Sequence, residues 1–213
     1  MALEEEKQLA GEAGAQLVEA GMRVGLGTGT TVAYLLAALA ERSVDAVYVA
    51  TSPQTEQAAR ALGLVLEPFE HLGQLDLAID GADQISADGW LIKGGGGAHT
   101  REKIVAASAT RFVVIADSSK LVDTLHAPVP LELLAFGIDA TLRHLSPTTL
   151  RDITLSPDGG LIADYHGEVG DPEQLARWLA DTPGVLGHGL FNPQLVSDVL
   201  VGVGGTVQRS PRR

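Results

Sequence analysis

The chain has 213 residues, which suits one large α/β domain or a large domain with a smaller companion. Apolar residues make up 45% of the sequence, so the chain can bury a core and is not intrinsically disordered. A net charge of −12 would repel nucleic acid, and we therefore expect no nucleic-acid partner.

The sequence contains no cysteine, which excludes thiol catalysis, thiolate metal sites and disulfide bonds. Its acidic start, M-A-L-E-E-E-K, differs from a signal peptide, which would be basic and then apolar. No apolar run approaches the roughly 18 residues of a membrane helix. We therefore expect a cytoplasmic protein that has no membrane partner.

The first part of the chain predicts a helix, a strand, a glycine-rich loop and a second helix. Apolar residues at helical spacing over 3–20 predict the first helix, and a strand over 22–25 leads into G-L-G-T-G-T-T at 25–31. The second helix follows over 32–41. Its amino terminus would face the loop, an arrangement that favours a bound anion.

The glycine-rich loop is a candidate phosphate site, because the hydroxyl groups of Thr28, Thr30 and Thr31 can join its backbone N–H groups. It is not a P-loop, since no Lys-Ser/Thr pair follows the glycines. It also lacks the third glycine of the nicotinamide-binding pattern. An ordinary strand-to-helix turn with capping threonines explains the loop equally well.

The middle of the chain continues the alternation of strands and helices. The predicted strands are 44–50, 64–66, 75–79, 90–92 and 112–117, and the predicted helices run from T-S-P-Q-T to about 62 and from Thr100, as the amino-terminal cap, to about 109. Continuous apolar strands that alternate with helices indicate the α/β class, with a mainly parallel sheet and helices on both of its faces.

The pattern changes near residue 127. The predicted elements are an extended segment over 129–136, a helix over 139–145, strands over 153–155 and 161–165 joined by S-P-D-G-G, and a helix over 171–179 capped by Asp171. We expect these elements to form a smaller α+β unit over 128–197. The larger domain would comprise 1–127 and 198–213, with a returning strand over 199–203 and a loose tail over 208–213.

Charged residues and glycines gather at the ends of these elements. D-G-A-D at 80–83 follows a strand, where ligands of open α/β sheets lie, although the motif alone favours a plain turn. Ordering the four glycines of K-G-G-G-G at 93–97 costs conformational entropy, which suggests that the backbone of this loop must approach a bound group. A flexible lid is the alternative interpretation, and it is also functional. Glu102 lies in a first helical turn, where the helix dipole alone favours an acid. Lys120 follows a strand end, and a surface lysine is the alternative interpretation.

Together these motifs provide two acids, an ammonium group, a loop of bare backbone and a third acid. This set suits proton transfer on a small anionic substrate. None of the six histidines has a second ligand at helical spacing, so we expect no metal site.

In their order and spacing, these segments resemble the type A ribose-5-phosphate isomerase family over nearly the whole chain. The segments that carry the resemblance are G-L-G-T-G-T-T at 25–31, D-G-A-D at 80–83, K-G-G-G-G at 93–97, T-R-E-K at 100–103, A-D-S-S-K at 116–120 and H-G-L-F at 188–191. The resemblance implies a Rossmann-like domain with a smaller α+β domain inserted before the last strand. It also implies a homodimer or homotetramer, with the oligomer contact expected in the smaller domain.

The resemblance implies interconversion of ribose 5-phosphate and ribulose 5-phosphate, in the non-oxidative pentose phosphate pathway, without a metal or another cofactor. Glu102 falls at the position of the base that moves a proton between C1 and C2 through an enediolate. Asp80 matches an acid tied to ring opening and hydroxyl contacts, and Asp83 matches its hydrogen-bonding companion. Lys93 falls where the developing oxyanion is stabilised. The implied substrate-binding residues are Lys7, Thr28, Gly29, Thr30, Thr31, Gly81, Ala82, Gly94, Gly95, Gly96 and Lys120.

Two positions depart from the family pattern. Gln84 stands where the family most often has Glu, and Gly160 stands where Asn is common. Neither residue belongs to the implied chemistry, so we expect these departures to affect supporting contacts and assembly.

Two other functions stay open. A non-enzymatic sugar-phosphate-sensing domain would keep the phosphate loop without needing Glu102, and a related sugar-phosphate isomerase or deaminase would keep most of the motifs. A nicotinamide-dependent dehydrogenase is excluded by the missing third glycine and by the lack of a ribose-binding acid after 47–50. The sequence does not distinguish a dimer from a tetramer, a pentose from a hexose, or the direction of the reaction.

Overall fold

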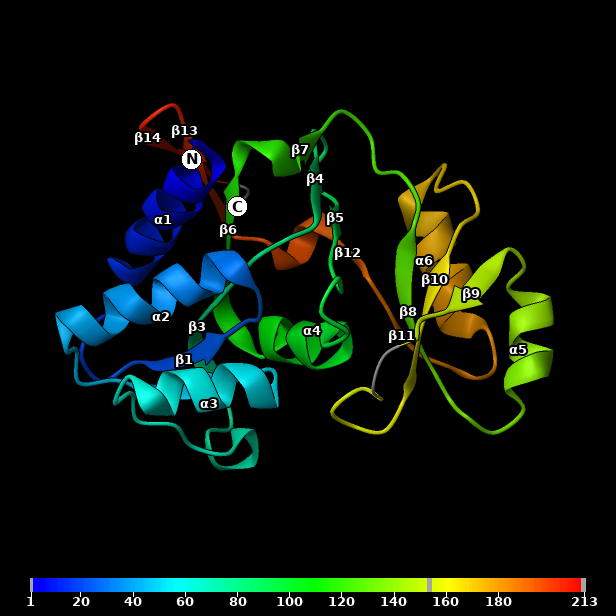
Figure 1. Cartoon of the computed structure of the whole chain (residues 1–213), viewed down its shortest axis with the longest axis horizontal. Helices are drawn as coiled ribbons and strands as arrows, with labels where there is room; N and C mark the ends of the chain where they lie inside the picture. Colours follow the sequence, from blue (N-terminus) through cyan, green and yellow to red (C-terminus); the bar gives the residue numbers. More distant parts are fainter. Residues whose placement is uncertain (1, 153–154, 212–213) are drawn as a thin grey trace. The chain divides into compact units, whose positions relative to one another are not determined.

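The structure, a computed structural model, describes residues 2–152 and 155–211 (Figure 1). The chain divides into two compact units. The larger unit consists of Met1–Ala82, Arg101–Lys120 and Gln194–Arg213, and the smaller unit consists of Asp83–Thr100 and Leu121–Pro193.

These bounds differ from the expected domain bounds at 83–100, 121–127 and 194–197. The two short strands of the first of these segments, β4 (Gln84–Ser86) and β5 (Leu91–Ile92), pair with strands of the smaller unit and do not enter the parallel sheet. The division of the chain into the two expected domains stays a prediction.

The described residues of the larger unit form a six-stranded sheet in the order β14-β13-β6-β3-β1-β2. Its strands are β1 (Arg23–Leu26), β2 (Val47–Ala50), β3 (Leu75–Asp80), β6 (Ala109–Asp117), β13 (Asp198–Val203) and β14 (Thr206–Pro211). Every neighbouring pair is parallel except β13 and β14. The predicted α/β class with a mainly parallel sheet is therefore confirmed, and β13 is the predicted returning strand.

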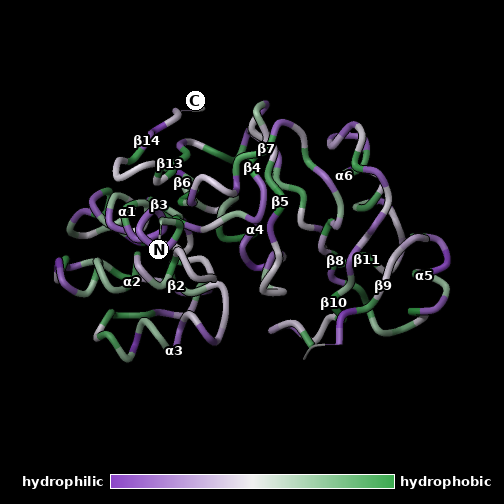
Figure 2. The backbone as a smooth tube through the Cα atoms, turned by 45° about the horizontal axis from the view of Figure 1, so that its top comes forward, coloured by the Kyte–Doolittle hydropathy of each residue, from purple (hydrophilic) through white to green (hydrophobic). Residues whose placement is uncertain are grey.

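In the sequence, the first helix precedes the strands of the larger unit, and the other helices and short turns lie between these strands. The helices are α1 (Ala2–Ala15), α2 (Thr30–Arg42), α3 (Pro53–Ala61) and α4 (His99–Ala107), with short 3₁₀ turns η1 (Phe69–His71), η2 (Ser118–Lys120) and η3 (Pro193–Leu195). In Figure 2, α3 carries both hydrophilic and hydrophobic colours, as expected for a helix that buries one face. None of the helices within the described residues is both long and apolar enough to cross a membrane.

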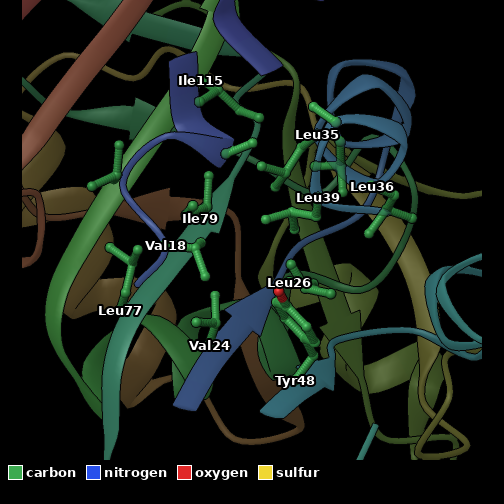
Figure 3. Packing of buried hydrophobic residues seen from close by; sticks show 14 of the residues in the cluster. Val18, Val24, Leu26, Leu35, Leu36, Leu39, Tyr48, Leu77, Ile79 and Ile115 are labelled. Carbon is green, nitrogen blue, oxygen red and sulfur yellow. The ribbon is translucent and has the colours of Figure 1, made fainter. Parts of the chain in front are cut away.

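One face of the sheet packs against α1 and α2. Figure 3 shows Leu35 and Leu39 of α2 pointing toward the sheet residues Ile79 and Ile115, and all four are fully buried. Helix α1 approaches the same face at Gly14, where an added Cβ would lie 3.1 Å from Ile115 and 3.4 Å from Ile79. Burial of each Leu or Ile side chain stabilises the folded state by about 1.5–3 kcal/mol. This core therefore holds the strands, and with them the strand ends, in place.

Helix α4 covers the opposite face. Side chains alternate across a strand, and Val24 and Leu26 point into the core described above, so Gly25 faces the other side. A Cβ on Gly25 would overlap Cγ1 of Val105, which is buried on α4. The bare backbone of Gly25 therefore allows α4 to lie close to the sheet.

The predicted loose tail over 208–213 is wrong for its described part, because residues up to Pro211 belong to β14 and pair with β13. The pairing covers the edge of β13, which would otherwise leave backbone groups unpaired. Arg209 donates to Oδ1 of Asp198 at 2.8 Å, and Arg111 donates to Oδ2 at 2.9 Å. Burial alone would raise the pKa of Asp198, but these two guanidinium groups lower it further than burial raises it.

The described residues of the smaller unit form two four-stranded sheets, β12-β5-β4-β7 and β11-β8-β10-β9. The further elements are β7 (Leu121–Val122), β8 (Val129–Leu133), β9 (Thr148–Leu150), β10 (Leu161–Tyr165), β11 (Val185–His188), β12 (Leu190–Phe191), α5 (Ile138–His144) and α6 (Pro172–Asp181). The predicted cap is confirmed, since Asp171 accepts from the N–H groups of Glu173 at 2.9 Å and Gln174 at 3.2 Å.

One local prediction needs correction, and another falls partly outside the described residues. Helix α4 begins at His99, so Thr100 lies inside the first turn and does not precede it as a cap. The predicted strand over 153–155 falls partly on residues 153–154, which lie outside the described residues. The antiparallel partner of β10 on that side is β9.

We expect Gly25→Ala to lower the free energy of unfolding by about 1–3 kcal/mol, because the added methyl overlaps Val105. In a Val105→Ala background the same substitution should cost at least about 0.5 kcal/mol less. Urea unfolding of the wild type, both single variants and the double variant measures this coupling. Equal costs in both backgrounds would contradict the packing of α4 against Gly25.

Candidate active site

The carboxylate of Asp80 lies against the backbone of the glycine-rich loop. Leu26 and Ile79 are register partners in β1 and β3, so Asp80 follows directly beside Gly27. The N–H groups of Thr28 and Gly81 donate to Oδ1 of Asp80 at 3.1 and 2.7 Å. Asp80 is only 3% exposed, so these amides replace the water that a buried carboxylate loses.

Position 27 has no space for a side chain, so glycine is required there. A Cβ on Gly27 would overlap Oδ1, Cγ and Cβ of Asp80. The N–H group of Gly27 donates to the carbonyl oxygen of Ile79 at 2.9 Å, which holds the loop beside the end of β3. At Gly27 the loop therefore makes room for the carboxylate of Asp80. From the sequence alone, its glycines were interpreted only as part of a possible anion-binding site.

The hydroxyl group of Thr28 belongs to a cluster of hydroxyl groups at the start of α3. Its Oγ1 lies 3.1 Å from that of Thr51, 2.9 Å from Oγ of Ser52 and 3.1 Å from Oγ1 of Thr55. Thr55 also donates to the carbonyl oxygen of Gly27 at 2.9 Å. The T-S-P-Q-T sequence predicted the start of the helix but not this connection, and the phosphate-binding role of Thr28 stays a prediction.

The amino terminus of α2 retains the features of an anion site. Gly29 precedes the helix with φ 122°, a conformation that favours glycine. Among the described residues, no side chain caps this end of α2. Thr30 is exposed and Thr31 is buried in the first turn. The first N–H groups of a helix without a cap are suited to an anionic ligand.

Lys7 of α1 is held by acidic neighbours. Its Nζ donates to Oε1 of Glu4 at 2.6 Å, while the hydroxyl group of Tyr34 donates to Oε2 of Glu4 at 2.9 Å. The hydrogen bond that Lys7 donates to Glu4 raises the pKa of Lys7, and the charge of Asp117 adds to this effect. Lys7 is therefore a cation near the carboxyl end of β6.

The A-D-S-S-K segment forms the turn η2 after β6, and Glu6 of α1 holds it. The N–H and hydroxyl groups of Ser118 donate to Oε2 of Glu6 at 2.9 and 2.6 Å, and the N–H group of Gly204 donates to Oε1 at 3.3 Å. Asp117 is buried, and its Oδ1 accepts from the N–H and hydroxyl groups of Ser119. The turn that carries Lys120 is thus fixed by two carboxylates.

Sequence reasoning missed Glu6. Its contacts with Ser118 cross 112 positions, and the acidic run at the start of the chain does not distinguish Glu6 from its exposed neighbours. The hydrogen bonds that Ser118 donates lower the pKa of Glu6, and the bond from its hydroxyl group has the larger effect.

Glu102 lies in the first turn of α4 and is only 5% exposed. The helix dipole favours an acid at this place but does not explain its burial, which costs solvation. The next residue, Lys103, has its pKa lowered to about 7 by burial. Charged groups at the start of α4 are therefore partly withdrawn from water.

The smaller unit holds Lys93 at the end of β5. Lys93 is 3% exposed, and its Nζ lies 5.5 Å from the centroid of the Phe191 ring, a cation–π contact. Its N–H group donates to the carbonyl oxygen of Gly189 at 2.9 Å. A Cβ on Gly189 would overlap the carbonyl oxygen of Lys93, so the H-G-L-F segment must pass this strand as bare backbone.

The glycine loop after Lys93 is bonded to Asp83 within the same unit. The N–H group of Gly95 donates to Oδ2 of Asp83 at 2.8 Å, and a Cβ on Gly95 would lie 2.9 Å from Oδ1. Gly94 has φ 111° and Gly97 has φ 74°, so both positions favour glycine. Gly95 and Gly96 are exposed. The structure thus brings together Asp83 and the loop that the sequence analysis selected separately.

Gln84 and Gly160, the two departures from the family pattern, have local explanations. The Gln84 amide donates to the carbonyl oxygen of His126 at 2.8 Å and accepts from its N–H group at 2.9 Å. A carboxylate could make only the second bond. At Gly160 a Cβ would overlap the carboxylate of Glu132, which is buried and accepts from the hydroxyl group of Ser156.

The predicted residues are therefore grouped within each unit as follows. The larger unit holds Lys7, Thr28, Gly29, Thr30, Thr31, Asp80, Gly81, Ala82, Glu102 and Lys120, and the smaller unit holds Asp83, Lys93, Gly94, Gly95 and Gly96. Direct bonds join Asp80 to Thr28 and Gly81, and Asp83 to Gly95. The described residues contain no group of three or more His, Cys, Asp or Glu side chains that could hold a metal ion.

Comparison with known proteins identifies relatives along most of the chain. Residues 47–205 match the family model described as ribose 5-phosphate isomerase A (phosphoriboisomerase A). A ribose-5-phosphate isomerase A of Roseiflexus castenholzii is 43% identical over 219 residues, covering 95% of this chain and 94% of the relative. One of Methanosarcina acetivorans is 45% identical over 201 residues, covering 87% of this chain and 86% of the relative.

Solved structures have the same fold. Ribose 5-phosphate isomerase A from Neisseria gonorrhoeae superposes with a TM-score of 0.93 at 28% identity, covering 100% of this chain and 99% of that chain. A D-ribose-5-phosphate isomerase in complex with phospho-erythronic acid gives 0.93 at 32% identity, covering 99% and 100%. A Pyrococcus horikoshii translation initiation factor, at 17% identity and a TM-score of 0.57, covers 96% of this chain and 65% of that chain and shares the fold alone.

We expect Glu6→Gln to destabilise the protein at neutral pH, and the loss to shrink as the pH falls through 4.5. The folded state lowers the pKa of Glu6, so its carboxylate stabilises the fold above 4.5, and this stabilisation is lost as the group is protonated. Urea unfolding over a pH series measures it, with Glu5→Gln on the exposed side of α1 as the control. A loss that does not change with pH would contradict the role of the charge.

Proposed function

The chain belongs to the ribose 5-phosphate isomerase A family, and from this premise we propose that Glu102 is the general base of an aldose–ketose isomerisation that passes through an enediolate. The substrates proposed are D-ribose 5-phosphate and D-ribulose 5-phosphate. The observation that carries the proposal is the burial of Glu102, which is 5% exposed in the first turn of α4 within the T-R-E-K segment.

The proposed reaction needs one base that serves two neighbouring carbons. The carboxylate of Glu102 takes the proton from C2 of the open-chain aldose, and the C–H electron pair forms the C1–C2 double bond while the aldehyde oxygen O1 takes up negative charge. The carboxylic acid then returns the proton to C1, as the hydroxyl group at C2 loses its proton and becomes the ketone. The proton lost from O2 balances the one gained by O1, so the aldose and ketose remain isomers and no oxidant or reductant is consumed.

Lys93 and the glycine amides are proposed to stabilise the charge on the enediolate oxygen. An ammonium group that is only 3% exposed interacts more strongly with an anion than one in water. The backbone of the H-G-L-F segment and the Phe191 ring hold Lys93 at the start of the loop. Donors already fixed in place do not have to reorganise when the charge appears.

Asp80 and Asp83 are proposed to act on the substrate hydroxyl groups, Asp80 in ring opening and Asp83 as its companion. Each carboxylate has one oxygen bonded to a backbone N–H group of a glycine-rich segment. The hydrogen bonds from these amides fix the orientation of each carboxyl group.

The phosphate group is proposed to bind at the amino terminus of α2, with Lys7 and Lys120 as cations. The first turn of α2 offers N–H groups that no described side chain caps, together with the hydroxyl groups of Thr30 and Thr31. Because the chain carries a net charge of −12, an anionic substrate requires such a locally positive site.

We also propose that the protein acts in the cytoplasm, in the non-oxidative pentose phosphate pathway. We further propose that it assembles as a homodimer or homotetramer. Large apolar side chains are exposed on the smaller unit, with Leu134 at 44%, Phe136 at 87% and Leu186 at 49%. Leu134 donates its N–H group to the carbonyl oxygen of Gly184 at 2.8 Å, so this segment runs beside the start of β11. Sedimentation equilibrium measures the assembly, and a monomer would contradict it.

We expect Glu102→Gln to lower kcat by about 100-fold or more, because the amide cannot take up a proton. Purified protein is incubated with ribose 5-phosphate and EDTA, and ketose formation is followed. Glu56→Gln is the matched control, since Glu56 is an exposed acid in the first turn of α3. A folded Glu102→Gln variant with near-normal kcat would remove Glu102 from the role of base.

A further inference from the structure

Two carbonyl groups of the glycine loop accept from one guanidinium group of the smaller unit. Nη1 of Arg151 donates to the carbonyl oxygens of Gly94 and Gly95 at 2.9 and 3.0 Å. Arg151 stands directly after β9, and 57 positions separate it from Gly94. Nothing in the sequence analysis connected these residues.

The guanidinium group is itself fixed by a bidentate ion pair with Asp164 of β10. Nε of Arg151 donates to Oδ2 and Nη2 donates to Oδ1, both at 2.7 Å. The two side chains are 18% and 17% exposed, so the pair is largely withdrawn from water. The hydrogen bond to Asp164 raises the pKa of Arg151, and the charge of Asp83 adds to this effect. Four of the five N–H donors of the guanidinium group are therefore in use.

These bonds set the direction of the loop's amides as well as its carbonyl groups. In a trans peptide the C=O of one residue and the N–H of the next point in opposite directions. Capture of the Gly94 carbonyl oxygen by Arg151 therefore turns the N–H group of Gly95 away from it, and that group bonds to Asp83. Capture of the Gly95 carbonyl oxygen turns the N–H group of Gly96 away from Arg151 in the same manner.

We propose that Arg151, oriented by Asp164, is a positioning residue for the reaction: it fixes two peptide planes of the glycine loop, so that the Gly95 amide holds Asp83 and the Gly96 amide faces the developing oxyanion. This inference rests on the proposed function, in which amides of the glycine loop stabilise the enediolate. Arg151 acts through the loop and not on the substrate. A run of four glycines has a large conformational entropy, and a rigid fork that bonds two successive carbonyl groups limits that freedom.

The role requires the shape of the guanidinium group and not only its charge. Lysine keeps the charge but cannot hold a carboxylate with two parallel bonds while it bonds two carbonyl groups. A residue that merely attracted the substrate phosphate would be replaced well by lysine. Arg151→Lys therefore separates positioning from attraction.

The test measures kcat and KM for ribose 5-phosphate in Arg151→Ala, Arg151→Lys and the wild type. We expect kcat to fall by about 10- to 100-fold in both variants with a smaller change in KM, because misplaced amides weaken interactions made in the transition state. Arg177→Ala is the control, since Arg177 forms an exposed ion pair with Glu173 on α6 of the same unit. Its kcat should equal that of the wild type.

Chemical rescue distinguishes positioning from a role in folding alone. Methylguanidinium, at concentrations that leave the wild type unaffected, should restore part of the kcat of Arg151→Ala, whereas methylammonium should not. Rescue should be lost in Arg151→Ala combined with Asp164→Asn, which removes the charge that holds the added cation. Equal rescue by both cations, or no rescue of a folded variant, would overturn the inference.

The outcomes also separate this inference from the proposed function. An inactive wild type, or an active Glu102→Gln variant, would refute the proposed function. If the wild type is active, Glu102→Gln is inactive and Arg151→Lys has the kcat of the wild type, then only the positioning role of Arg151 is refuted.

Discussion

Close approach of carboxylates to glycine backbone is the constraint on which both parts of the candidate site depend. Asp80 occupies the space that a Cβ on Gly27 would take, and it accepts from two backbone N–H groups there. Asp83 lies against Gly95 in the same manner, 2.9 Å from the position of a Cβ. One acid of D-G-A-D thus meets a glycine loop in the larger unit and the other in the smaller unit. Gly27 and Gly95 are needed because a side chain at either position would displace one of the acids.

The sequence predicted what depends on local pattern and missed what depends on distant partners. Buried strands, the cap at Asp171 and the returning strand β13 follow from hydrophobic runs and capping residues, and the structure confirms them. The family was identified from short motifs in order. The strand β14 was missed because its residues are polar and its stability comes from pairing with β13. Glu6 and Arg151 were missed because their partners lie 112 and 57 positions away.

Fixed carboxylates and fixed amides serve the proposed isomerisation in different ways. A base must exchange a proton with carbon, so its environment has to allow both of its protonation states. Amides and an ammonium group have only to remain where negative charge develops. The many bonds that hold the glycine loop and the turn after β6 suit the second task. The burial of Glu102 at the start of a helix suits the first, since it limits competition from water.

The most direct test of this account is the kcat/KM of Gly27→Ala for ribose 5-phosphate, measured beside its urea unfolding. The added methyl has to displace the carboxylate of Asp80, so we expect kcat/KM to fall by about 100-fold in a protein that still unfolds cooperatively. Gly63→Ala, which strains a backbone with φ 82° and is not part of the candidate site, serves as the comparison for loss of stability alone. A Gly27→Ala variant with the kcat/KM of the wild type would contradict the account.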